Sequence, residues 1–199
     1  MRILVATTAV AALAAGSALA ADLYTPPQVA VPTPVYTTPV RAYDWTGPYA
    51  GALVGYGWGA FGAPIGSAPT GFVAGGFVGY NVQAGNVVYG AEMDAAWSGR
   101  SDGAGNDVNW TSSFRGRIGY AFGRVLVYGT GGLAVAGVST APGPSTSTEI
   151  GWTAGGGAEF AITDSLFARA EYLYSSYGAI PDASSLSTQE VRLGIGFRF

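Results

Sequence analysis

The feature that most constrains this chain is an alternation of apolar residues with small or charged residues at every second position, which recurs from residue 45 to residue 199. In the segment 87–98 the odd positions are apolar, with Tyr89 and Trp97 near its ends, and the even positions are glycine, small or acidic. Successive side chains point to opposite faces of a strand, so this segment has one apolar and one polar face. Helical periodicity is not convincing anywhere in this range, and we expect an all-β chain.

The alternation predicts eight strands in a single domain, which suits a chain of 199 residues. It is strong at 87–98, 110–122, 166–174 and 190–199, and weaker at 49–58, 72–81 and 152–162. The remaining segment, 125–138, is apolar or small on both faces, so the sequence leaves its inward face unassigned.

The predicted connections alternate in length. Longer ones rich in Gly, Pro, Ser and Asp occupy 60–71, 99–109, 139–148 and 175–186, whereas 83–86, 123–124 and 163–165 are tight turns. An even number of strands, long loops at one end and short turns at the other are typical of outer-membrane barrels. We therefore expect an eight-stranded antiparallel up-and-down transmembrane β-barrel with short periplasmic turns and longer extracellular loops.

A soluble barrel such as a lipocalin and a helical membrane protein are the alternatives. A soluble barrel would turn its apolar faces inward, and the alternation alone does not decide between the two directions. Tyr and Trp at the ends of the apolar faces favour a membrane, because they resemble interfacial belts. The apolar faces also run for about ten residues, the length of a tilted membrane strand. Gly and Pro interrupt the uncharged stretches too often for membrane helices.

Before the predicted barrel, the sequence has the pattern of a targeting segment and a linker. Met1-Arg2 is followed by an apolar run at 3–15 and by Ala18-Leu19-Ala20, which predicts a signal peptide at 1–20 that is cleaved after Ala20. A transmembrane anchor is the alternative, but the run is shorter than the roughly 20 residues that span a bilayer. Repeated proline predicts an extended periplasmic linker at 21–44, and the barrel then occupies 45–199.

Composition excludes several kinds of chemistry. The chain has no His and no Cys, and all nine basic residues are Arg. Ser-His-Asp catalysis, His or Cys metal sites and covalent chemistry on Lys are therefore unavailable to it. The net charge is −3, so nothing favours binding of nucleic acid, which would need a basic stripe on the protein. We expect no enzymatic activity, no cofactor, no metal site and no nucleic-acid partner.

Ten charged residues map to the predicted inward faces. Five are acids and five are arginines, and eight strands leave an interior just wide enough for side chains to fill. Because buried charges require partners, we expect a plug of salt bridges, with an ion path or a pair of catalytic carboxylates as the alternatives. The ten residues are Glu92, Asp94, Arg115, Arg117, Glu159, Arg169, Glu171, Glu190, Arg192 and Arg198.

Antiparallel counting predicts which of these charges lie opposite each other. If Trp97 and Trp110 face lipid from opposite sides of their loop, Glu92 lies opposite Arg115. The same counting across two later connections gives two further pairs, Glu159 with Arg169 and Glu171 with Arg192.

The chain ends in an aromatic residue on an apolar alternating segment. Such an end resembles the signal that the barrel-assembly machinery reads, and its residues are Val191, Leu193, Ile195, Phe197 and Phe199. We expect this machinery, the secretion machinery and outer-membrane lipid to be the partners, and we leave any extracellular partner open.

Several motifs occur in order along the predicted barrel. They are Trp45-Thr46-Gly47-Pro48-Tyr49-Ala50-Gly51, Gly79-Tyr80-Asn81-Val82-Gln83, Gly90-Ala91-Glu92, Arg115-Gly116-Arg117-Ile118-Gly119-Tyr120, Tyr128-Gly129-Thr130-Gly131-Gly132-Leu133-Ala134, Ala170-Glu171-Tyr172-Leu173-Tyr174 and Gly196-Phe197-Arg198-Phe199. Together they resemble the small porin-family outer-membrane β-barrels of alphaproteobacteria, which belong with the OmpA-like eight-stranded barrels.

The resemblance implies an abundant envelope protein that stabilises the outer membrane. Relatives are credited with binding at the cell surface, including binding of haem, although this chain has no His to ligate haem. We therefore expect a structural outer-membrane protein that contributes to envelope integrity, with exposed loops and a largely plugged lumen. A surface binding module or adhesin that acts through its loops, and a narrow passive pore, are the alternatives.

Overall fold

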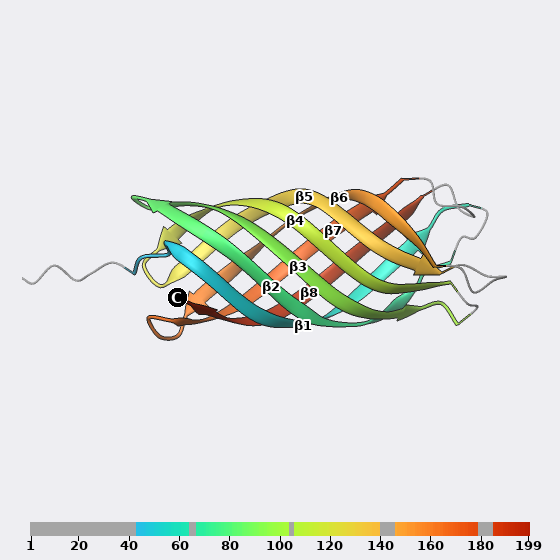
Figure 1. Cartoon of the computed structure of the whole chain (residues 1–199), viewed down its shortest axis with the longest axis horizontal. Coiled ribbons are helices and arrows are strands. Elements are labelled where there is room, and N and C mark those ends of the chain that lie inside the picture. The colour runs from blue at the N-terminus through green and yellow to red at the C-terminus, as the bar shows by residue number, and fades with distance from the viewer. Residues whose placement is uncertain (1–42, 64–66, 104–105, 140–145, 179–184) are drawn as a thin grey trace, which may run out of the picture. The chain divides into compact units, whose positions relative to one another are not determined.

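The computed structural model describes residues 43–199 apart from 64–66, 104–105, 140–145 and 179–184 (Figure 1). The predicted signal peptide, and the predicted linker up to residue 42, lie outside the described residues. Eight antiparallel strands close into a barrel in which each strand pairs with its neighbours in sequence and β1 pairs with β8, as predicted. The strands are β1 (Gly47–Phe61), β2 (Thr70–Ala84), β3 (Val87–Ser101), β4 (Asp107–Phe122), β5 (Val125–Ser139), β6 (Thr146–Ala161), β7 (Leu166–Tyr177) and β8 (Leu186–Arg198).

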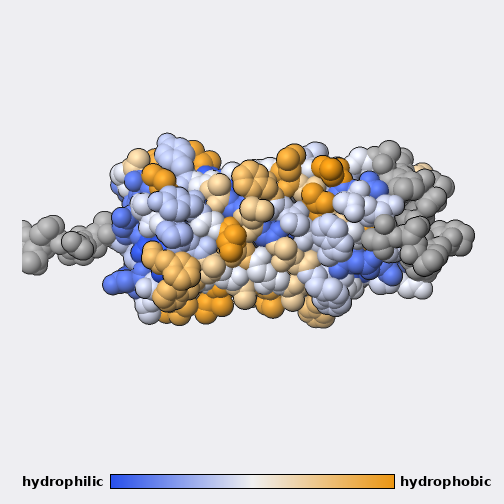
Figure 2. Space-filling view, in the orientation of Figure 1, coloured by the Kyte–Doolittle hydropathy of each residue, from blue (hydrophilic) through white to orange (hydrophobic). Residues whose placement is uncertain are grey.

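The barrel wall is apolar outside and charged inside. Phe114 is 55% exposed on the outer surface, whereas the next residue, Arg115, is 0% exposed in the lumen. Figure 2 shows apolar side chains along the wall and hydrophilic residues gathered towards the ends. This direction excludes the soluble-barrel alternative, because a soluble barrel would bury the apolar face. Among the described residues, no helix is long and apolar enough to cross a bilayer.

Short turns join the strands at the end that carries the C-terminus (Figure 1). Gly85 and Gly123 begin two of these turns with φ angles of 63° and 62°, a left-handed conformation that glycine adopts without steric cost. Both turns fall where the sequence predicts them. The opposite end carries the longer connections, so the short turns are periplasmic and the longer loops extracellular.

The extracellular ends of the strands are longer than the sequence predicts. The predicted loop at 99–109 contains the end of β3 and the start of β4, which leaves only 102–106 between them. The other three predicted loops shorten in the same way, to 62–69, 140–145 and 178–185. Outside the bilayer a strand needs no apolar outer face, so the pairing continues where the alternation has ended.

Strand β5 has its even-numbered residues inside, which settles the face that the sequence left unassigned. Leu126, Tyr128 and Ala134 are buried, whereas Val127 and Leu133 face outward. The lumen around β5 is lined by apolar as well as charged residues, and for this reason both faces of the segment look alike in sequence.

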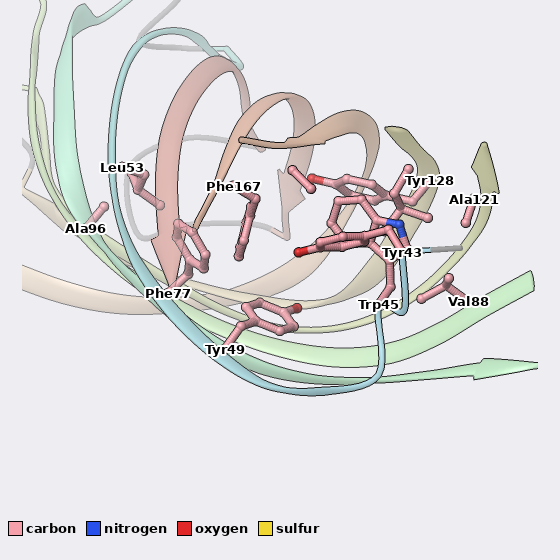
Figure 3. Close-up of a cluster of buried hydrophobic side chains, with 12 residues drawn as sticks. Tyr43, Trp45, Tyr49, Leu53, Phe77, Val88, Ala96, Ala121, Tyr128 and Phe167 are labelled. Carbon is pink, nitrogen blue, oxygen red and sulfur yellow. The ribbon is translucent and has the colours of Figure 1, made fainter. Parts of the chain in front are cut away.

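Two apolar clusters enclose a charged layer. The periplasmic cluster includes Trp45, Tyr49, Phe77 and Phe167 (Figure 3), and the extracellular cluster includes Phe61, Val108, Tyr177 and Leu186. Strand β4 passes through all three levels, from Val108 through Arg115 and Arg117 to Ala121.

Candidate functional site in the barrel lumen

The register of the barrel agrees with the three predicted pairings. Trp97 lies opposite Trp110, which sets Glu92 opposite Arg115. The other two opposed pairs are Glu159 with Arg169 and Glu171 with Arg192. The three predicted registers are thus confirmed. Each keeps apolar residues outside and charges inside, and a slip of one residue would reverse both faces.

Glu92 is the centre of the periplasmic half of the charged layer. Its carboxylate lies 2.7 Å from Arg169, 2.8 Å from Arg115 and 3.2 Å from Arg117. The Tyr49 hydroxyl donates a further hydrogen bond of 2.8 Å to the same carboxylate. Burying a carboxylate is costly unless it is paired and hydrogen-bonded, and Glu92 has four such partners from three strands.

Glu159 completes this half of the layer. It lies 2.6 Å from Arg169 and 2.7 Å from Arg117, so the same two guanidinium groups bridge both carboxylates. Two arginines and two acids thus form one connected group rather than isolated pairs.

Asp94 and Glu190 organise the extracellular half. Asp94 lies 2.9 Å from Arg192, and Glu190 lies 2.5 Å from Arg192 and 2.8 Å from Arg100. The Ser113 hydroxyl donates a hydrogen bond to Asp94.

Arg115 connects the two halves. Its Nη2 atom donates to Glu92 at 2.8 Å and to Asp94 at 3.0 Å, while Nη1 donates to Glu171 at 3.0 Å. Glu171 lies opposite Arg192 in the register, yet it accepts this hydrogen bond from Arg115 and another from Tyr128. Side chains therefore reach across the lumen to strands that are not their neighbours.

Aromatic rings fill the space beside the charges. The Arg117 guanidinium lies 3.9 Å from the centre of the Tyr128 ring, and the Arg169 guanidinium lies 4.0 Å from that of Phe77. Such contacts stabilise a desolvated cation through the ring quadrupole.

The rings fit because glycines face them on the neighbouring strands. A Cβ atom at Gly79 would overlap the hydroxyl of Tyr49, which lies directly opposite it. In the same way, a Cβ atom at Gly196 would overlap the ring of Phe167. The glycines of the inward faces thus provide the room in which the lumen is filled.

Arg198 lies outside the charged layer in which it was predicted. It is half-buried at the last position of β8, where its Nη2 atom donates to the Asp164 backbone oxygen at 2.9 Å. Arg198 has the inward orientation that the alternation predicts, but it lies at the periplasmic rim and outside the charged layer. The other nine predicted lumen residues are buried.

Arg100 is a member of the layer that the prediction missed. A register shift between Trp97 and Arg100 marks a bulge near the extracellular end of β3, and the Arg100 side chain is fully buried beyond it. The signal in the sequence was the continuation of the even positions, from Glu92 and Asp94 through Ser98 to Arg100. With Arg100, the described lumen holds five buried acids and five buried arginines.

The C-terminal residues of the predicted assembly signal lie on the outer surface. Val191, Leu193, Ile195, Phe197 and Phe199 are all exposed there. The rings of Phe197 and Phe199 lie 5.3 Å apart, and the Phe199 amide donates to the Pro48 backbone oxygen at 3.0 Å. The end of the chain is therefore tied to the start of β1.

A closed eight-stranded barrel that is apolar outside and ion-paired inside is a small transmembrane β-barrel of the bacterial outer membrane. The chain belongs to the outer membrane protein beta-barrel domain family, whose model matches residues 7–199. It is 38% identical over 179 residues to the 25 kDa outer-membrane immunogenic protein of Brucella ovis, and the matched region covers 86% of each chain. It is also 38% identical over 174 residues to a 22 kDa outer membrane protein of Rhizobium leguminosarum bv. viciae, and the matched region covers 81% of this chain and 82% of the relative.

Solved structures share the fold at low sequence identity. The crystal structure of Neisserial surface protein A matches with a TM-score of 0.58 and 18% identity, over 77% of this chain and 98% of that one. Ail, the attachment invasion locus protein of Yersinia pestis, matches with a TM-score of 0.50 and 17% identity, over 77% and 99%. The outer-membrane relatives place this protein in the outer membrane.

Proposed function

We propose that this protein is a structural component of the outer membrane that contributes to envelope integrity and has a closed lumen. The observation that carries the proposal is the balanced layer of five buried acids and five buried arginines, enclosed by an apolar cluster on each side. A water-filled channel needs a polar wall with open space, whereas these side chains take one another as partners. Each of the five acids is ion-paired with an arginine and shielded from solvent, and the proposal therefore assigns the protein no enzymatic activity.

Its proposed partners follow from where it resides. The exposed apolar wall contacts outer-membrane lipid, the secretion machinery exports the chain, and the barrel-assembly machinery inserts it. The part of the predicted linker that precedes residue 43 acts as a periplasmic tether.

Single-channel recording tests the closed lumen. Purified, folded protein in planar bilayers at physiological salt should give no stable channels, with a known porin from the same preparation method as the positive control. Stable and reproducible channels of nanosiemens size would contradict a closed lumen and support the pore.

Envelope integrity needs a separate experiment in cells. A deletion strain should become more sensitive to detergents and to large antibiotics that an intact outer membrane excludes. Complementation with the full chain should restore resistance. A deletion strain as resistant as its parent would contradict the structural role.

A surface binding role is the second candidate. Two names favour it, since one relative is an immunogenic outer-membrane protein and Ail, which shares the fold, is an attachment invasion locus protein. Replacement of the extracellular connections by short turns should then abolish attachment of cells to host surfaces while leaving detergent resistance intact. Loss of resistance with attachment unchanged would favour the structural role alone.

A further inference from the structure

The residues just before β1 pack inside the end of the barrel instead of extending away from it into solvent. Residues 43–46, here called the periplasmic strap, precede β1 at the end of the barrel that carries the short turns. Trp45 is 1% exposed and Tyr43 is 9% exposed. Figure 3 shows both rings lying among Val88, Ala121 and Tyr128 inside the barrel end. This end faces an aqueous compartment, so the hydrophobic effect favours burial of both rings.

The strap makes a hydrogen bond at each of the three periplasmic turns. At the turn between β2 and β3, the Trp45 amide donates to Gln83 Oε1 at 2.8 Å, and the Gln83 amide donates to Thr46 Oγ1 at 3.1 Å. At the turn between β4 and β5, Trp45 Nε1 donates to the Gly123 oxygen at 3.2 Å. At the turn between β6 and β7, the Tyr43 hydroxyl donates to the Asp164 oxygen at 3.3 Å.

Two arginines also contact the strap: Arg198 at the end of β8, and Arg124 in the turn between β4 and β5. The Arg198 guanidinium lies 4.4 Å from the centre of the Tyr43 ring. Arg124 lies 5.6 Å from the same ring and forms an ion pair of 2.9 Å with the Asp164 side chain. The Tyr43 hydroxyl is a hydrogen-bond donor at neutral pH, and burial raises its pKa further above that range.

Gly47 turns the chain from the strap into β1. Its φ angle is 129°, in the range that L side chains rarely adopt, and a Cβ atom there would lie 3.2 Å from the Phe199 oxygen. The Asp44 side chain accepts a hydrogen bond of 2.8 Å from the Thr46 amide, which closes a local turn before the glycine.

We propose that the periplasmic strap seals the periplasmic mouth of the barrel and docks only after β1 and β8 have paired. Its partners come from three turns and from the last strand, and only a closed barrel brings these elements into one ring. Docking of the strap is therefore a late step of assembly that depends on closure. Once docked, the strap separates the charged layer from the periplasm.

A single cysteine tests the seal. The chain has no cysteine, so Val88→Cys places one thiol within the cluster that the strap covers. Folded protein should react slowly with a charged methanethiosulfonate reagent, and Trp45→Ala added to Val88→Cys should raise the rate about tenfold or more, because labelling follows local opening. The matched control is Trp97→Ala with Val88→Cys, since Trp97 is 64% exposed on the outer wall and lies away from the strap.

An unchanged rate in the Trp45→Ala protein would overturn the seal, and so would rapid labelling when the strap is intact. Gel mobility without heating verifies that each variant has formed a barrel. Conductance should stay absent in the Trp45→Ala protein because the ion-paired layer is intact. A failure of the strap is thereby distinguishable from a failure of the closed lumen.

The order of docking is tested without changing the strap. The chain has five tryptophans, and replacement of Trp58, Trp97, Trp110 and Trp152 by Phe leaves Trp45 as the only one. During refolding into lipid vesicles, protection of Trp45 from acrylamide should develop with or after the compact gel band. Protection before that band would overturn the proposed order. Quenching in the folded barrel as strong as in the unfolded chain would overturn docking altogether.

Discussion

Glu92 on β3 and Arg115 on β4 lie directly opposite each other, and their charged groups are 2.8 Å apart inside the barrel. The pair also joins the two halves of the charged layer, because Arg115 reaches Asp94 and Glu171 as well. Its loss therefore affects more than one contact.

Arg115→Ala should destabilise the barrel by about 3–5 kcal/mol, because it removes a cation shared by three buried acids and leaves Glu171 without the ion pair that Arg115 makes with it. The combination of Glu92→Gln with Arg115→Met keeps the charges of the lumen balanced, and it should cost less than Arg115→Ala alone. Urea unfolding in lipid vesicles measures both. Arg124→Ala is the control, since its ion pair with Asp164 is exposed and should contribute about 0–1 kcal/mol. A double variant less stable than Arg115→Ala would contradict the prediction.

Glycines on the two faces of the wall should respond differently to alanine. Gly79→Ala should destabilise the barrel by about 1–3 kcal/mol, because the added methyl group overlaps Tyr49 in a filled lumen. Gly116→Ala is the matched control on the outer face, where the nearest atom to a Cβ is the Gly131 oxygen at 3.9 Å. The same unfolding assay compares them, and equal effects would show that the lumen has spare room at Gly79.

Deletion of Phe199 should sharply lower the amount of protein in the outer membrane while synthesis and export continue. The expected reason is loss of the aromatic C-terminus of the assembly signal. Quantitative blots of membrane and periplasmic fractions measure this. Phe122→Ala removes another exposed outer-wall aromatic and should leave the level unchanged. If both changes lower the level equally, Phe199 contributes only apolar area.

Mass spectrometry of protein from the membrane fraction should find an N-terminus at Ala21. The reason is the small-residue cleavage site at Ala18-Leu19-Ala20. Ala20→Leu should slow cleavage and leave a longer chain. Mature protein that retains Met1 would contradict the assigned signal peptide.

Much of the fold could be predicted because its rules are local. A strand needs only its own alternation to define two faces, and short turns such as that at Gly123 limit the register of the next strand. Glu159 and Arg169 are separated by a single turn, so their pairing follows from counting along the sequence. The ends of the strands could not be predicted, because pairing beyond the bilayer leaves no apolar pattern.

The sequence by itself determined the faces of every strand except β5, the three opposed registers and the inward placement of Glu92 and Arg115. Only the tertiary structure decided which charges meet across the lumen, such as Arg115 with Glu171, and it alone brought Trp45 into the barrel end. The physical reason is barrel closure. Distances between non-neighbouring strands depend on the tilt and stagger of the whole sheet, which no single strand contains.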